Sequence, residues 1–141
     1  MPLITDCLSR GQSVSFSPRG ISMLPMLRQG LDSVTLSPVS GRLKKYDIPL
    51  YRRADGHYVL HRIVACKDVY TCIGDNQYQY EYGIAHAQVI GVVSAFCRGG
   101  KQYSVNHAGY QLYCRIWHYS RFARRVLRAV KRRIIKLFIK K

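Results

Sequence analysis

Tyr58-Val-Leu-His-Arg-Ile-Val-Ala65 is a run of aromatic, β-branched and aliphatic residues interrupted only by His61 and Arg62. Such a composition predicts a β-strand. Further strand-like segments lie at residues 14–17, 33–37, 47–51, 69–73 and 88–96. Turn residues such as Gly, Pro, Asn and Asp separate these segments. Short strands at this spacing predict a mainly β fold, built as a compact antiparallel body.

The C-terminal part of the chain follows a helical pattern instead. It contains no proline after residue 110, and basic residues fill much of the space between its apolar ones. The apolar residues recur at helical spacing: Ala123, Val126, Leu127, Val130, Ile134, Leu137 and Phe138. We expect a basic amphipathic helix, or two helices with a break near residues 118–120. The predicted organisation is a lead-in of about one helical turn (1–12), a β domain (13–109) and a helical tail (110–141).

The charge of the chain is concentrated in this tail. The protein has 141 residues and a formal net charge of +16, from 23 Lys and Arg against 7 Asp and Glu. Residues 115–141 hold eleven of the basic residues and no acidic one. A segment of this kind indicates an anionic partner, either lipid headgroups or nucleic acid.

Other features narrow the setting of the protein. None of the five cysteines forms a C-x-x-C pair, so we expect no zinc knuckle, and no metal or cofactor is predicted. We see no apolar segment of signal-peptide or transmembrane length. An odd number of cysteines without a secretory signal fits reduced thiols. We therefore expect a cytoplasmic protein, peripheral on the inner face of the membrane.

A serine in the segment Gly20-Ile-Ser-Met-Leu-Pro-Met-Leu27 is a candidate nucleophile. Gly20 permits a close backbone approach, and Pro25 stiffens the turn after Ser22. A serine is a poor nucleophile unless a base lies within hydrogen-bond reach. By itself, the segment also fits an ordinary turn serine.

Three downstream residues can complete such a site. His61 interrupts an apolar strand, and histidine is well suited to accept a serine proton near neutral pH. Asp75 and Glu81 offer carboxylates that can orient a histidine base. Each also has an ordinary interpretation: a half-buried strand histidine, a turn aspartate and a solvated loop glutamate.

Together these segments resemble the signal peptidase and LexA-type repressor superfamily. The Ser22 segment is similar to its serine-methionine-x-proline nucleophile box, and Arg28-Gln-Gly-Leu-Asp-Ser-Val34 to the stretch that follows. His61-Arg62-Ile63 begins 39 residues after Ser22 and resembles the second catalytic box of the histidine-type enzymes. These are the endoplasmic-reticulum, archaeal and sporulation-type signal peptidases. Gly74-Asp75-Asn76 is similar to the next box of that subgroup. The resemblance covers about residues 13–100.

The resemblance implies a β catalytic domain of the signal-peptidase type with Ser22 as nucleophile and His61 as general base. The triad acid of the subgroup lies six residues after the first aspartate, where this chain has Glu81. Asp75 is the other candidate. Met23 and Pro25 are expected to contact substrate, which the family binds as an extended strand at a sheet edge. The expected function is a serine endopeptidase that cleaves a peptide or protein precursor at the membrane surface.

Several alternatives remain open. The same scaffold can serve as a non-catalytic binding module whose tail binds lipid or nucleic acid. A lysine base is the weaker hypothesis, because a lysine must be desolvated to lose its proton. We expect Lys44, Lys45 and Lys67 to lie in solvated segments. The tail can lie in a membrane interface with Trp117 and Tyr119 at headgroup depth, bind nucleic acid, or pack its apolar face on its own body.

Overall fold

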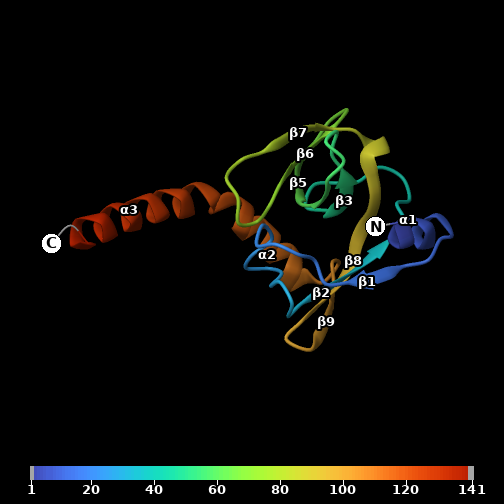
Figure 1. The fold of residues 1–141 in the computed structure, drawn as a ribbon, viewed down its shortest axis with the longest axis horizontal. Helices are drawn as coiled ribbons and strands as arrows, with labels where there is room; N and C mark the ends of the chain where they lie inside the picture. Colours follow the sequence, from blue (N-terminus) through green and yellow to red (C-terminus); the bar gives the residue numbers. More distant parts are fainter. Residues whose placement is uncertain (1, 140–141) are drawn as a thin grey trace.

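Strands dominate the chain up to residue 104, and helices follow, as the sequence pattern predicts. The computed structural model describes residues 2–139 (Figure 1). The elements are α1 (Pro2–Ser9), β1 (Val14–Phe16), β2 (Ser33–Ser37), β3 (Pro49–Arg52), β4 (Tyr58–Leu60), β5 (Arg62–Cys66), β6 (Tyr70–Ile73), β7 (Glu81–Ile84), the 3₁₀ turn η1 (His86–Gln88), β8 (Val89–Arg98), β9 (Lys101–Ser104), α2 (Ala108–Tyr119) and α3 (Arg121–Ile139). The break between α2 and α3 falls at Ser120, so the two-helix form of the tail is confirmed.

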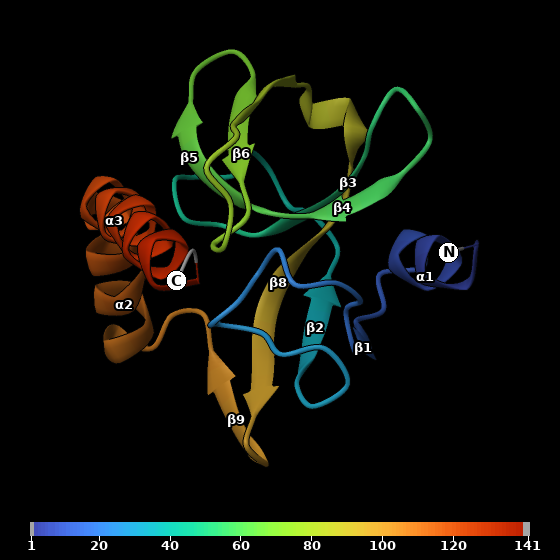
Figure 2. The same ribbon diagram turned by 60° about the vertical axis from the view of Figure 1, so that its left-hand side comes forward.

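The strands pair antiparallel in two sheets. The larger sheet has the order β1-β2-β8-β3-β4, and β9 also pairs with β8. The smaller sheet has the order β5-β6-β7. Helices α1 and α2 lie on opposite sides of the β body (Figure 2), and α3 projects away from it (Figure 1). Among residues 2–139, no helix combines the length and apolarity that crossing a bilayer requires.

The single strand expected at residues 58–65 is divided at His61. The segment before it is β4, which pairs with β3 in the larger sheet, whereas β5 after it pairs with β6 in the smaller sheet. The physical reason is that the residues on either side of His61 pack in different hydrophobic cores. Leu60 belongs to one cluster and Ile63 to the other. His61 therefore lies where the chain passes from one sheet to the other.

Three further elements, α1, β7 and β9, differ from expectation. The lead-in forms the two-turn helix α1, because Leu8 packs into the main core close to Gly91 of β8, where an added Cβ would lie 2.9 Å from Leu8 Cδ1. The strands β7 and β9 have no predicted counterpart. β9 is the polar sequence Lys-Gln-Tyr-Ser, and its pairing with β8 creates a strand that apolar alternation does not reveal.

A buried ion pair joins the smaller sheet to the loop after β6. Arg62 is 1% exposed and Asp75 is fully buried. Arg62 Nε and Nη2 each donate to one carboxylate oxygen of Asp75 at 2.8 Å. A two-point contact of this kind fixes both planar groups relative to each other.

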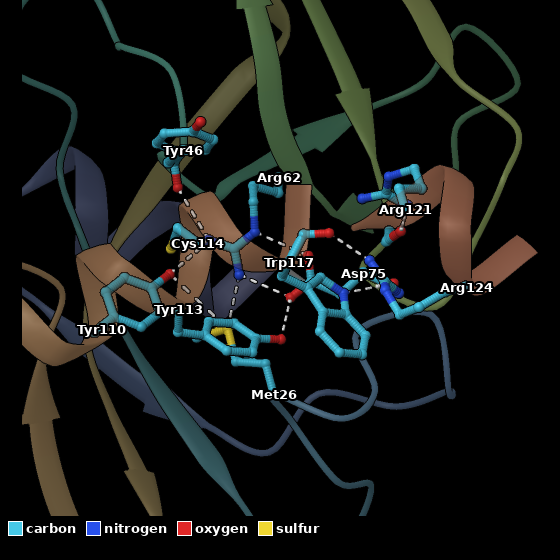
Figure 3. Close-up of polar contacts among 11 residues, drawn as sticks. Met26, Tyr46, Arg62, Asp75, Tyr110, Tyr113, Cys114, Trp117, Arg121 and Arg124 are labelled. Carbon is cyan, nitrogen blue, oxygen red and sulfur yellow. Dashed lines mark hydrogen bonds and ion pairs between the residues drawn. The ribbon is translucent and has the colours of Figure 1, made fainter. Parts of the chain in front are cut away.

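The guanidinium of Arg62 also binds the first C-terminal helix, in addition to the Tyr46 carbonyl and Met26 Sδ. Its Nη1 lies 2.8 Å from the Tyr110 hydroxyl and 2.9 Å from Cys114 Sγ, both on α2 (Figure 3). From the same helix, the Tyr113 hydroxyl donates to Asp75 and Trp117 Nε1 donates to the Asp75 carbonyl. The Trp117 indole, which the membrane alternative places at headgroup depth, is thus hydrogen-bonded to the body. The ion pair thus attaches α2 to the β domain.

We predict that Asp75→Ala lowers the free energy of unfolding by about 3–5 kcal/mol, because it leaves the buried Arg62 cation without its counter-charge. Urea denaturation followed by circular dichroism measures this loss. Asp68→Ala is the matched control, since Asp68 is exposed in the turn before β6 and should change stability by less than about 0.5 kcal/mol. Equal stability of the two variants would contradict the assigned role of the ion pair.

Candidate active site

Ser22 and His61 line the same cavity, although 39 positions separate them in the chain. The cavity has a volume of about 220 Å³. Its walls come from the Ser22 turn, from β4 and from the residues that flank them: Pro18, Arg19, Gly20, Ser22, Met23, Leu27, Arg53, Tyr58, Val59, Leu60, His61 and Gln77. His61 lines this cavity together with the three residues of β4 that precede it.

The loop after β6 contacts the Ser22 turn and holds it in place. Asn76 donates its backbone N–H to the Ser22 carbonyl at 2.8 Å and its side-chain amide to the Ile21 carbonyl at 3.2 Å. Gly74 lies so close that a Cβ there would be 2.7 Å from the Ser22 carbonyl oxygen. A glycine at this position is therefore required for the two segments to meet. Since Asp75 is anchored by Arg62, the ion pair also determines where the serine turn lies.

A second ion pair holds the chain after the turn. Arg28 makes a two-point contact with Asp32, through Nε to Oδ2 at 2.9 Å and Nη2 to Oδ1 at 2.8 Å. The backbone N–H of Arg28 also donates to Asp32. Hydrogen bonding by Arg28 lowers the pKa of the buried Asp32 carboxyl to about 2. The segment that carries Ser22 is thus closed on itself before it enters β2.

Glu81 is the carboxylate that contacts His61. His61 Nδ1 lies 2.9 Å from Glu81 Oε1. The Tyr51 hydroxyl donates to Glu81 Oε2 at 2.9 Å, and Arg53 Nε donates to the same oxygen at 2.8 Å. Arg53 Nη2 also contacts Oε1. A carboxylate on Nδ1 favours the tautomer with the proton on that nitrogen, which leaves Nε2 to accept a proton.

The surroundings keep the histidine neutral and the glutamate charged. His61 is only 3% exposed, and burial lowers the pKa of its imidazole. The Glu81 charge opposes this shift and the Arg53 charge adds to it. Burial alone would raise the pKa of Glu81, but hydrogen bonds from Arg53 and Tyr51 hold it below its usual value. At neutral pH the pair therefore consists of a neutral base and an ionised carboxylate.

The other predicted residues lie as follows. Asp75 uses both of its carboxylate oxygens on Arg62, which makes it a structural brace. Met23 is buried in the main core and lines the cavity. Pro25 is exposed, and the residues that line the cavity do not include it. The lysine candidates at positions 44, 45 and 67 are all exposed, and none of them lines the cavity.

Sequence reasoning missed two residues that orient Glu81. Tyr51 is fully buried in β3, and Arg53 follows that strand directly. Tyr51 looks like a core aromatic and Arg53 like a solvated charge, so neither type nor spacing distinguishes them. The only available signal is that Glu81, the sole glutamate of the chain, needs donors if it is to stay ionised while half-buried.

Comparison of the chain with protein-family models, with curated proteins and with solved structures found no match.

We predict that His61 titrates below 6.5, the ordinary value for histidine, when its ring signals are followed by NMR against pH. Glu81→Gln should lower the pKa further, because the imidazolium loses its counter-charge. Arg53→Gln should raise the pKa, because it removes a positive charge from the same pair. Shifts of the same sign in the two variants would show that Glu81 and Arg53 do not act on His61 in the way the geometry indicates.

Proposed function

We propose that this protein is a serine endopeptidase of the signal-peptidase type, with Ser22 as nucleophile, His61 as general base and Glu81 as the residue that positions His61. The observation that carries the proposal is the shared cavity: Ser22 and His61 line it together, and Glu81 occupies Nδ1 of the imidazole. A nucleophile, a base and an orienting carboxylate are the three parts that acyl transfer by a serine requires.

The chemistry follows from these positions. Ser22 Oγ attacks the carbonyl carbon of a peptide bond while its proton passes to His61 Nε2. Backbone N–H groups near Ser22 bind the oxyanion that forms. The imidazolium, stabilised by Glu81, then gives its proton to the leaving amine as the C–N bond breaks. Water, deprotonated by His61, hydrolyses the resulting ester and restores the serine hydroxyl.

The position of the cavity favours an extended peptide as substrate. Strand β4 is the outer strand of the larger sheet, and all three of its residues, Tyr58 to Leu60, line the cavity. Its free edge offers backbone donors and acceptors with which a peptide can pair as an added strand. Ser22 lines the same cavity as this strand.

Local geometry also supports the family-level proposal. In the resemblance to histidine-type signal peptidases, a glycine-aspartate-asparagine box follows the histidine. Here Gly74 and Asn76 contact the Ser22 turn, and Asp75 binds Arg62, the neighbour of His61. Each residue of this box therefore has a physical role in holding the two proposed catalytic segments together, which an unrelated turn sequence would not require.

A non-catalytic binding module on the same scaffold is the alternative. Arg53 favours it, because its guanidinium binds both oxygens of Glu81 and withdraws negative charge from His61. In such a module the basic C-terminal tail would bind anionic lipid or nucleic acid, and Ser22 would not react. The two functions differ in the reactivity of Ser22.

We expect an acyl-lactam or fluorophosphonate probe to form an adduct on Ser22, located by mass spectrometry of the purified protein. His61→Ala should slow labelling by about 10²- to 10⁴-fold, the usual contribution of a general base. Ser22→Ala should abolish it, whereas Ser104→Ala, in the exposed strand β9, should leave it unchanged.

A histidine-type signal peptidase should be labelled in parallel to show that the probe reacts with this kind of site. If that enzyme reacts and Ser22 does not, the endopeptidase proposal is wrong and the binding module is favoured. Equal labelling of His61→Ala and the wild-type protein would remove His61 as the base.

A further inference from the structure

The helix α3 has two chemically distinct faces. It carries eight basic residues and no acidic one. Its apolar side chains are spaced three and four residues apart, which places them along one face. These side chains are between 45% and 79% exposed: Phe122, Val126, Leu127, Val130, Ile134, Leu137 and Phe138. An apolar face of this length normally marks a surface that binds something.

The helix contacts the body through its basic face, which is the reverse of ordinary packing. Arg121 Nη1 donates to the Gly74 carbonyl at 3.2 Å, and Arg128 Nη2 donates to the Asn76 side chain at 2.9 Å. The Arg124 guanidinium stacks 3.4 Å from the centre of the Trp117 ring (Figure 3). Of the three alternatives for the tail, the one that packs the apolar face on the protein's own body is therefore wrong. Guanidinium groups make these contacts, and the apolar face points away from them.

The positive charge of α3 limits which partners can cover its apolar face. A second copy would bring two helices together, each with eight positive charges, and their repulsion opposes the contact. A nucleic acid would neutralise the basic residues but leave the apolar side chains in water. A bilayer with anionic lipids accommodates both faces, because headgroups neutralise the charges while the acyl region receives the apolar side chains.

We propose that α3 lies in the interface of a membrane that contains anionic lipids, with its apolar face toward the acyl chains. Lys131 and Lys136, on the exposed half of the helix, extend to the headgroups by their long stems. The contacts of Arg121 and Arg128 fix the start of α3 against the loop that braces Ser22. The helix therefore attaches the candidate site itself to the membrane surface.

The test is flotation of the full-length protein with phosphatidylcholine vesicles, with and without about 30 mol% phosphatidylglycerol. We expect binding only to the anionic vesicles, weakened by high salt. Replacing Leu127, Ile134 and Phe138 by Gln together should weaken binding by at least about 100-fold without changing the charge. Replacing Arg132 and Lys136 by Gln should weaken it by about 30-fold.

The matched control replaces Leu112 and Ile116 by Gln, because both lie exposed on α2; this variant should bind vesicles like the wild-type protein. Ser22→Ala should also bind normally, so the membrane proposal and the peptidase proposal can fail separately. Circular dichroism checks that each variant keeps its helices. Equal binding to neutral vesicles would overturn the proposal. The proposal would also be overturned if the wild-type protein were a dimer and the variant with the three α3 apolar replacements a monomer. It would fail as well if the protein bound an oligonucleotide more tightly than anionic vesicles and this variant bound the oligonucleotide equally well.

Discussion

The ion pair between Arg62 and Asp75 is the interaction on which the rest of the molecule depends. Both groups are buried, so each charge is tolerable only because the other neutralises it at two points. One partner lies beside His61 and the other lies between the two residues that contact the Ser22 turn. The same guanidinium also binds α2. A single electrostatic contact therefore sets the relative positions of both catalytic candidates and the C-terminal helices.

The two carboxylates near the candidate site, Asp75 and Glu81, have different partners. Asp75 binds Arg62 and the Tyr113 hydroxyl and makes no contact with His61 among the hydrogen bonds of the described residues, whereas Glu81 binds Tyr51, Arg53 and His61. The longer glutamate side chain still brings an oxygen to 2.9 Å from Nδ1. Arg53 is what distinguishes this arrangement from a simple triad, since it holds Glu81 ionised and at the same time opposes protonation of His61.

The C-terminal helix shows how composition and packing can disagree. An amphipathic pattern usually predicts that the apolar face is the buried one. In α3 the arginines find carbonyl and aromatic partners in the loop after β6 and on α2, so the apolar face remains exposed. The charge distribution and the exposure of this face together support a membrane partner, and neither observation would do so alone.

The sequence by itself determined the β character of most of the first hundred residues and the helical tail, because strand, helix and turn preferences are local. The candidates Ser22, His61 and Glu81 came from its resemblance to the histidine-type signal peptidases. The sequence did not determine that the run around His61 divides between two sheets, or that Asp75 binds Arg62 while Glu81 binds His61. Those outcomes depend on which distant segments pack together: Leu60 and Ile63 enter different cores, and Tyr51 and Arg53 reach Glu81 across about thirty positions. Only the tertiary structure decides such contacts, since side-chain type alone gives them no local signal.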